Sequence, residues 1–410
     1  MKSSPTADAA VAYLSTPEAI RERACAVLAA GLAGRLAHFT IDLARLPTTA
    51  DLVATVTRER HPSGTVPPHS RWRHFDVGGH DRVTALERAL HRLSVDERVR
   101  AKLDLAVVSV LLDAGAGPRW RYLEAETGQQ HARSEGLAVA SLRMFEAGFF
   151  SADADEPARV DAHALLTMTD DCLAAALQVS AGNPLAGLSG RAALLRQLGR
   201  ALQQAPELFG KREPRPGHLL DALREQSRAG RVEAAEILRA VLMGLGQIWP
   251  GRLALGGVNL GDVWPHPAAG GAGPSAGLVP LHKLSQWLTY SLIEPLTEAG
   301  LIVSGLDRLT ALAEYRNGGL FLDTGVLEPR HPAVLGETHR PGDEVIVEWR
   351  ALTVALLDRL APLVRQRLGV RDLPLASILE GGTWAAGRRL ADERRGGATP
   401  IRIDSDGTVM

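Results

Sequence analysis

The sequence predicts a mainly α fold. Hydrophobic residues make up 45% of the 410-residue chain but aromatic residues only 4%, so the core must consist largely of Leu, Ala and Val. Such a composition favours helices over sheets. Apolar residues also recur at helical spacing along most of the chain, whereas strand-like segments are few and short. We therefore expect a helical protein with small β pieces near the C-terminus.

Pro, Gly and basic loops divide the chain into helical segments. Thr16-Pro17-Glu18 is a good helix start, since proline is favoured at the first helical position. The loop 250–280 is the largest irregular segment, and we expect its tip, 267–277, to be mobile. Ile401 and Ile403 alternate in the tail and predict a short strand before a turn. Helices are predicted over 81–113, 134–148, 158–181, 187–204, 216–228, 231–249, 280–300 and 343–368.

The composition excludes several classes of protein. With 46 basic and 47 acidic residues, the chain lacks the excess positive charge that nucleic-acid binding uses. No stretch of 18 uncharged apolar residues predicts a membrane span, and the N-terminus lacks a signal peptide, so we expect a cytoplasmic protein. Cys25 and Cys172 lie in Ala/Leu-rich helical segments and are predicted to be buried thiols, with no disulfide or metal-binding spacing.

The segment 306–327 carries the strongest local signal. Its pattern predicts a short helix that ends at 317–319, Asn-Gly-Gly, and continues into an extended run at 320–322. Glu314 would then lie in the last helical turn, where the helix dipole disfavours a carboxylate. Such a locally unfavourable acid indicates either a functional site or a solvated surface residue paired with an arginine.

A second candidate lies on the predicted helix 345–364, which is apolar on most sides and therefore buried. Glu348 and Arg350 must then be partnered, either in a structural ion pair or as a site carboxylate and a substrate-binding guanidinium.

Loops rich in aromatic and basic residues offer candidate substrate-binding groups. Arg71, Trp72, Arg73 and His74 are suited to a phosphate or sugar, because guanidinium groups match phosphate oxygens. Histidines in this loop match no zinc spacing.

Two further places carry similar side chains. Trp120 and Tyr122 can stack on a flat ligand or plug a junction between lobes. His282 and Lys283 start an apolar helix. The Lys283 ammonium is either a cation that binds a phosphate or a group that only extends into solvent. Nucleotide-binding, P-loop, zinc-protease and serine-hydrolase motifs are absent, so we expect neither a metal nor an organic cofactor.

Several phrases together resemble the uracil catabolism protein 4 family of fungi and bacteria. They occur in the order HSRWRHF (69–75), DAGAGPRWRYLEAETG (113–128), RSEGLAVAS (133–141), GDVWPH (261–266), LVPLHKLSQWLTYSLIEPL (278–296), LAEYRNGGLFLDTGVL (312–327), EVIVEWRALTVALLD (344–358), GGTWAAGR (381–388) and SDGTVM (405–410). The resemblance implies one family-wide unit over 1–410, with possible lobes at 1–150 and 151–410, the second carrying most site residues.

The resemblance also implies a function. Members of this family act in a pyrimidine-breakdown route that opens the uracil ring while ribose is attached, with ribosylurea as an intermediate and urea as a product. The expected substrate is therefore a small nucleoside- or nucleotide-derived molecule, and the ring-opening enzyme is a possible functional partner. Two alternatives remain: a ureidohydrolase or amidohydrolase that attacks the urea C–N bond, or a non-catalytic partner of the ring-opening enzyme.

A more distant resemblance, to queuosine-5′-phosphate N-glycosidases, suggests residue roles and a two-lobed helical fold similar to helix-hairpin-helix DNA glycosylases. Their Asp-Tyr-Arg motif is similar to Glu314-Tyr315-Arg316, with Glu in place of Asp, so Asp323 is a second candidate carboxylate. Cleavage of a ribose C1′–N bond passes through an oxocarbenium-like state that a carboxylate stabilises. Glu314, Asp323 and Glu348 are the predicted catalytic residues, and the predicted substrate-binding residues are Arg71, Trp72, Arg73, His74, Trp120, Tyr122, His282, Lys283, Tyr315, Arg316 and Arg350.

Overall fold

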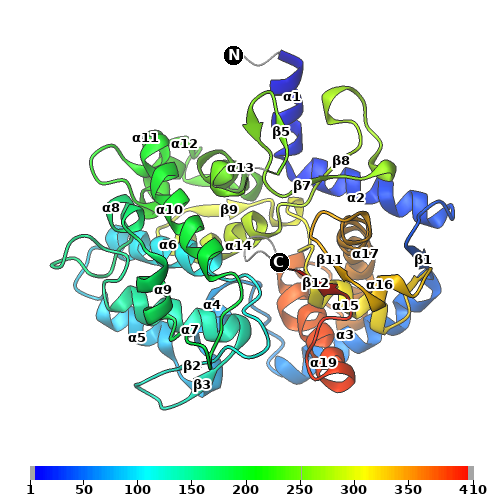
Figure 1. The fold of residues 1–410 in the computed structure, drawn as a ribbon, viewed down its shortest axis with the longest axis horizontal. Helices are drawn as coiled ribbons and strands as arrows, with labels where there is room; N and C mark the ends of the chain where they lie inside the picture. The colour runs from blue at the N-terminus through cyan, green and yellow to red at the C-terminus, as the bar shows by residue number, and fades with distance from the viewer. Residues whose placement is uncertain (1–4, 251, 405–410) are drawn as a thin grey trace. The chain divides into compact units, whose positions relative to one another are not determined.

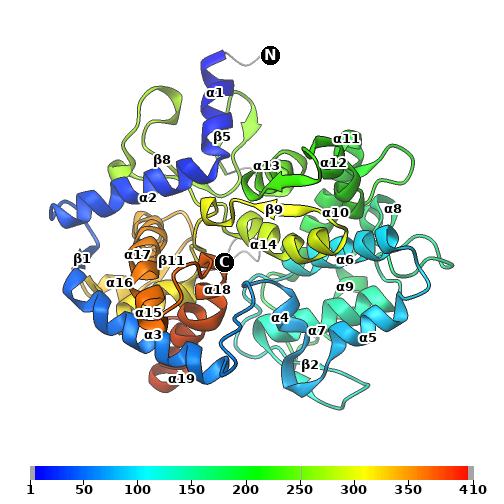
Figure 2. The same cartoon turned by 180° about the vertical axis from the view of Figure 1, so that it is seen from behind.

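The computed structural model describes residues 5–250 and 252–404, and it is mainly helical, as predicted (Figures 1 and 2). Within the described residues, the chain forms two compact units. The first unit contains 5–69, 252–286 and 305–404, and the second contains 70–250 and 287–304. These boundaries differ from the predicted division at residue 150, because the N-terminal helices pack against a helix near the C-terminus.

The first unit is built around α17 (Glu344–Leu368), which packs against α2, α3 and α15. Figure 1 shows blue N-terminal helices beside the orange α17. This helix is buried on most sides, as its apolar sequence predicted. Its helical neighbours in this unit are α1 (Pro5–Leu14), α2 (Pro17–Leu32), α3 (Leu46–Arg60), α15 (Tyr315–Asp323), α16 (Ala333–Gly336), α18 (Leu375–Ile378), the π-helical turn η8 (Leu379–Thr383) and α19 (Trp384–Arg395).

Short two-stranded pieces complete the first unit. β1 (Phe39–Ile41) pairs antiparallel with β10 (Leu327–Pro329), and β7 (Val263–Pro265) pairs antiparallel with β8 (Leu278–Pro280). The other pairs are the antiparallel β5 (Ala254–Leu255) and β6 (Val258–Asn259), and the parallel β11 (Thr338–His339) and β12 (Arg402–Ile403). β12 confirms the strand predicted in the tail, whereas most of the predicted turn after it lies outside the described residues.

The second unit is also helical. Its helices are α4 (Trp72–Phe75), α5 (Arg82–Ala89), α6 (Val95–Leu111), α7 (Arg133–Glu146), α8 (Ala162–Leu166), α9 (Asp170–Ala176), α10 (Leu188–Gln204), α11 (Pro206–Phe209), α12 (Leu219–Gln226) and α13 (Ala234–Leu245). Its strands are the antiparallel β2 (Tyr122–Leu123) and β3 (Gln130–His131), and the parallel β4 (Arg231–Glu233) and β9 (Ile302–Ser304). The helix α14 (Lys283–Glu298) begins in the first unit and continues in the second.

Local sequence signals set several boundaries. Thr16 caps α2 by accepting a hydrogen bond from the Ala19 N–H, which confirms the predicted start. The predicted helices 81–113 and 158–181 are each two helices, because Ser94 and Thr169 cap a new helix within them. Both cysteines are exposed, so their predicted burial was wrong.

Short 3-10 turns occur between the longer elements. The tip of the 250–280 loop contains two of them and is tied to α2, because the Arg23 guanidinium donates hydrogen bonds to the Ala269 carbonyl and the Ser275 hydroxyl. The described 3-10 turns are η1 (Leu43–Arg45), η2 (Val77–Gly79), η3 (Pro216–His218), η4 (Gly246–Ile248), η5 (Pro267–Ala269), η6 (Gly273–Ser275) and η7 (Leu306–Arg308).

Candidate functional site

Glu314 lies at the N-terminal end of α15. Its carboxylate oxygens accept hydrogen bonds from the backbone N–H groups of Arg316 (2.6 Å) and Asn317 (2.5 Å). The predicted helix ending at 317–319 was therefore wrong, because the helix begins where it was expected to stop. This end of the helix dipole favours a carboxylate, so the position of Glu314 breaks no local rule.

Two glycines explain the error. Gly318 and Gly319 lie inside α15 and pack against neighbouring segments, where they do not terminate the helix. A Cβ at Gly318 would lie 2.7 Å from Cε2 of Trp349, closer than real contacts allow. A Cβ at Gly319 would lie 3.4 Å from Pro400, an ordinary contact distance. Gly318 therefore permits the close approach of α17, a use of glycine that the sequence does not distinguish from helix termination.

The β7–β8 hairpin places a buried acid, Asp262, at the start of α14. The strand register pairs Val263 with Pro280, so Asp262 comes beside Leu281 and its carbonyl accepts the Leu281 N–H at 2.9 Å. Its carboxylate accepts the backbone N–H of Lys283 at 3.0 Å and the indole N–H of Trp264 at 2.6 Å. Sequence reasoning missed Asp262, although the GDVWPH phrase contains it.

Arg350 connects this hairpin to the chain before α15. Its guanidinium donates two 2.8 Å hydrogen bonds to the Asp262 carboxylate, and its Nε donates to the carbonyl of Ala313 at 3.1 Å. Burial opposes ionisation of Asp262, but Arg350 outweighs it and lowers the pKa of that carboxyl. Arg350 is thus partnered in a buried ion pair, as expected for a charged residue on an apolar helix. Its hydrogen bond to Ala313 also fixes the residue next to Glu314.

Lys283 lies in the first turn of α14, and its ammonium acts electrostatically on Glu314. Burial raises the pKa of the Glu314 carboxyl above its usual value, against the lowering effects of its two backbone donors, Lys283 and Arg316. The carboxylate is therefore held in a fixed orientation but is poorly compensated by charge, which suits a group that stabilises a positive charge in a ligand.

Asn317 adds an unsatisfied polar group close to Glu314 in the chain. Its side chain is 1% exposed, and neither its amide nitrogen nor its amide oxygen makes a hydrogen bond. A buried unpaired amide costs about 1–3 kcal/mol, so this side chain is a candidate group for binding a ligand. The sequence analysis placed Asn317 in a turn and did not identify it as a candidate.

Other predicted residues of the first unit lie around these groups. The Arg316 guanidinium stacks over the Tyr315 ring at 4.9 Å and donates to the Gly397 carbonyl at 3.1 Å. His282 is buried, with a positive φ of 43° and its Nε2 3.0 Å from the Leu14 carbonyl oxygen. Burial lowers the pKa of His282. These contacts position α14 and α15.

Two predicted carboxylates do not join Glu314. Asp323 lies at the other end of α15, nine residues and roughly 13 Å along the helix, where it forms two hydrogen bonds of 2.7 and 2.6 Å to Arg395. Glu348 lies two positions before Arg350 on α17 and so on a different face of the helix. Its Oε1 accepts the backbone N–H groups of His38 and Phe39.

The Arg71 loop belongs to the second unit and forms a buried polar network there. The guanidinium of Arg71 is fully buried, donates to Ser109 at 2.7 Å and pairs with Asp113 at 3.1 Å. Ser134 bridges His74 and Asp113 with contacts of 2.9 Å each. Burial lowers the pKa of Arg71 despite the Asp113 carboxylate.

The remaining predicted residues of the second unit have structural partners. Trp72 donates its indole N–H to the Ser291 carbonyl at 2.8 Å, and Arg73 pairs with Glu294 at 2.6 Å. Tyr122 lies in β2 and is buried. Trp120 is fully buried within this unit and donates to the Leu177 carbonyl at 2.9 Å, so it packs in the core.

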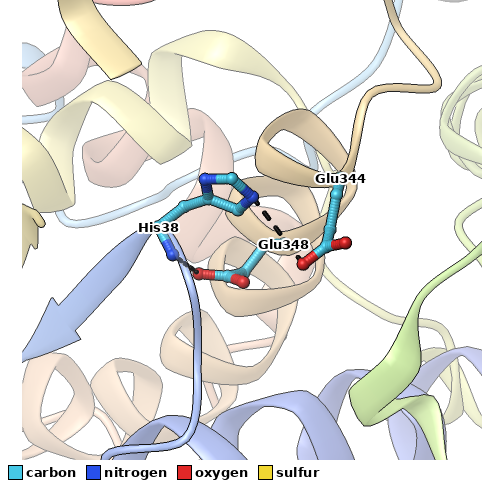
Figure 3. A group of neighbouring side chains, drawn as sticks. All are labelled: His38, Glu344 and Glu348. Atoms are coloured by element: carbon cyan, nitrogen blue, oxygen red, sulfur yellow. Dashed lines mark hydrogen bonds and ion pairs between the residues drawn. The ribbon is translucent and has the colours of Figure 1, made fainter. Parts of the chain in front are cut away.

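One group with metal-ligand chemistry occurs among the described residues. His38, Glu344 and Glu348 bring one ligand atom each to within 4.8 Å of one another (Figure 3). A separate surface pocket of about 350 Å³ is lined by residues of α3 and α19 and contains none of the predicted site residues.

Comparisons with known proteins cover nearly the whole chain. Residues 13–410 match the family described as "Protein of unknown function (DUF1688)". The chain is 40% identical to Protein urg3 of Schizosaccharomyces pombe, covering 98% of this chain and 99% of that protein. It is 38% identical to Uracil catabolism protein 4 of Lachancea kluyveri, covering 99% and 100%.

The chain therefore belongs to the family described as "Protein of unknown function (DUF1688)". The resemblance to the uracil catabolism protein 4 family, based on scattered phrases, is therefore confirmed over nearly the whole chain. No helix in the part of the chain that the structure describes is both long and apolar enough to span a bilayer.

Proposed function

We propose that the protein acts in uracil catabolism and hydrolyses the N-glycosidic bond of ribosylurea, or of its 5′-phosphate, to give urea and the free sugar. The name of the Lachancea kluyveri relative supports the pathway. The observation that carries the reaction is the buried carboxylate of Glu314, held by two backbone N–H groups at the start of α15.

Glu314 has the properties that this chemistry requires. Breaking the C1′–N bond develops positive charge on the ribose ring, and a nearby fixed carboxylate stabilises that charge without reorganising. The two backbone donors occupy one lone pair on each oxygen and leave further lone pairs for the ligand. Because burial raises the pKa of Glu314, a positive charge on the substrate gains more from this carboxylate than from one exposed to water.

Neighbouring groups supply contacts for the two halves of the substrate. Lys283 offers a cation for a ribose hydroxyl or a 5′-phosphate. The unsatisfied amide of Asn317 complements urea, because its oxygen accepts a urea N–H and its nitrogen donates to the urea carbonyl. The Asp262–Arg350 pair is already saturated, and its role is to hold Lys283 and Ala313 in place.

The test is a product assay on the purified protein with ribosylurea and with its 5′-phosphate. Intact urea in equal amount to free sugar is the expected result, together with loss of turnover in a folded Glu314→Gln variant. Ammonia and carbon dioxide in place of urea would indicate attack on the urea C–N bond. Absence of turnover with retained substrate binding would favour a non-catalytic role, and full activity of Glu314→Gln would exclude the assignment of Glu314.

A further inference from the structure

His38, Glu344 and Glu348 converge from two elements that are distant in sequence. His38 directly precedes β1, while Glu344 and Glu348 lie one turn apart on the same face of α17. Figure 3 shows the imidazole of His38 and both carboxylates turned toward one another. The two backbone hydrogen bonds from His38 and Phe39 to Glu348 fix this convergence, since they tie the start of β1 to the helix.

The contact between the His38 and Glu344 side chains is too long for a hydrogen bond. His38 Nε2 lies 3.7 Å from Glu344 Oε1, beyond the 2.7–3.2 Å of an N–H···O bond. Around a metal with bonds of about 2.0–2.2 Å, adjacent ligand atoms in a tetrahedral site lie roughly 3.3–3.6 Å apart. The observed spacing is close to that of a ligand pair, and Glu344 is exposed enough to move the remaining distance.

The buried carboxylate of Glu348 provides independent evidence. Glu348 is fully buried, and its Oε2 makes no hydrogen bond. A buried carboxylate oxygen that is only weakly compensated is costly. His266 Nε2, also buried and without a hydrogen bond, lies 3.4 Å away and is too distant to satisfy this oxygen well.

Outer contacts orient the group in the way that metal ligands are oriented. His38 Nδ1 lies 3.1 Å from His331 Nε2. When His38 donates its Nδ1–H to His331, its Nε2 keeps a lone pair that faces the Glu344 carboxylate. The Nδ1 of His266 accepts the Ala268 N–H, so in its neutral form the proton is on Nε2, toward Glu348.

We propose that His38, Glu344 and Glu348 form a binding site for a divalent first-row metal ion such as Zn²⁺ or Mn²⁺, with His331 and His266 as outer-shell partners. One imidazole and two carboxylates suit such ions, and two carboxylates balance their charge. Three protein ligands leave coordination positions for water or a ligand. The site lies on a different face of α17 from Arg350, so it is independent of the proposed role of Glu314.

Metal binding is tested on the full-length protein after treatment with a chelator. Calorimetric titration with Zn²⁺ and with Mn²⁺ is expected to show one site per chain, and X-ray absorption of the Zn²⁺ form is expected to show nitrogen and oxygen ligands without sulfur. Glu344→Gln is the most informative variant, because this side chain is 44% exposed and Gln has nearly the same shape, so we expect the fold to be kept. We expect it to weaken binding at least about tenfold.

Two further variants control this result. Glu337→Gln removes an exposed carboxylate directly after α16 and is expected to bind the metal as the wild type does. His331→Gln changes only the outer shell and is expected to weaken binding roughly 10- to 100-fold. The proposal is overturned if the chelated wild-type protein binds neither ion, or if Glu344→Gln binds as tightly as Glu337→Gln.

Discussion

Glu124 in the second unit and Glu314 in the first are both buried carboxylates, but their surroundings differ. Arg82 and Arg143 donate hydrogen bonds of 2.5–2.9 Å to Glu124, and Thr127 adds one of 2.6 Å. The Glu314 carboxylate accepts only two backbone N–H groups among its described hydrogen bonds. The Arg82 hydrogen bonds are the main cause that lowers the pKa of Glu124, whereas burial raises that of Glu314. A saturated carboxylate stabilises the fold, while a partly compensated one is available to a ligand.

The largest expected effect is on stability, at Glu124. Glu124→Gln removes the carboxylate that pairs with the buried Arg82 and one of the carboxylates that pair with Arg143, and breaking such a buried network costs about 3–5 kcal/mol. Urea denaturation of the full-length protein measures the loss of unfolding free energy. Hydrogen exchange in α5 and α7 shows whether the loss lies in the second unit. A cost below about 1 kcal/mol would contradict the distinction drawn between the two carboxylates.

At Glu314 the expected effect is on activity. Glu314→Gln removes the charge and keeps only one of the two oxygens that accept a backbone N–H, so turnover should fall roughly 10²–10³-fold. Loss of stability should stay near about 1 kcal/mol, as for other changes at a helix N-cap. Measuring kcat/KM and the denaturation midpoint on the same preparations separates the two effects, with Glu337→Gln as the control.

Replacement of Asn317 separates binding from folding. Asn317→Ala removes an amide that lacks partners in the folded protein, so stability should be unchanged or higher, because alanine also favours helix. If the proposed function holds, kcat/KM for ribosylurea should fall by about 10- to 100-fold, equivalent to about 1–3 kcal/mol. A destabilised variant with unchanged kcat/KM would show that Asn317 has only a structural role.

The two glycines of α15 offer a matched pair. Gly318→Ala should destabilise the first unit by about 1–3 kcal/mol, because the new methyl group meets Trp349. Gly319→Ala meets only an ordinary contact and should be neutral or stabilising by up to about 1 kcal/mol, since alanine favours helix. Thermal denaturation distinguishes the two, and equal destabilisation would argue against close packing at Gly318.

The smallest expected effect is a difference in pH dependence. Because the pKa of Glu124 is lowered on folding, its stabilisation is present above the usual glutamate value of 4.5 and is lost as the pH falls below it. The pKa of Glu314 is raised, so its ionisation destabilises the fold as the pH rises above 4.5 toward its folded value. In Glu314→Gln this loss of stability above pH 4.5 should be absent. Measuring the free energy of unfolding of both proteins from pH 4 to pH 8 tests this.

The activity profile gives the matching observation. If ionised Glu314 stabilises the reacting ribose, the acid limb of kcat/KM should lie above pH 4.5. An acid limb at or below that value would show that a different group controls the reaction.

The sequence by itself determined the helical class, the start of α2 at Thr16, the burial of α17 and the family, because these depend on local periodicity, capping residues and matching phrases. It also identified Glu314 as unusual, although for the wrong reason. Only the tertiary structure decided that Gly318 and Gly319 lie inside a helix, since the packing of Trp349 on Gly318 is a long-range contact.

The same reason applies to the partners of the site. Asp262 is 88 residues from Arg350, and His38 is 310 residues from Glu348. Local spacing carries no information on such pairs, because the β7–β8 hairpin and the packing around α17 bring them together. The sequence thus determined which residues can carry a charge. The tertiary structure decided which of these charges are fully hydrogen-bonded and which remain available to a ligand.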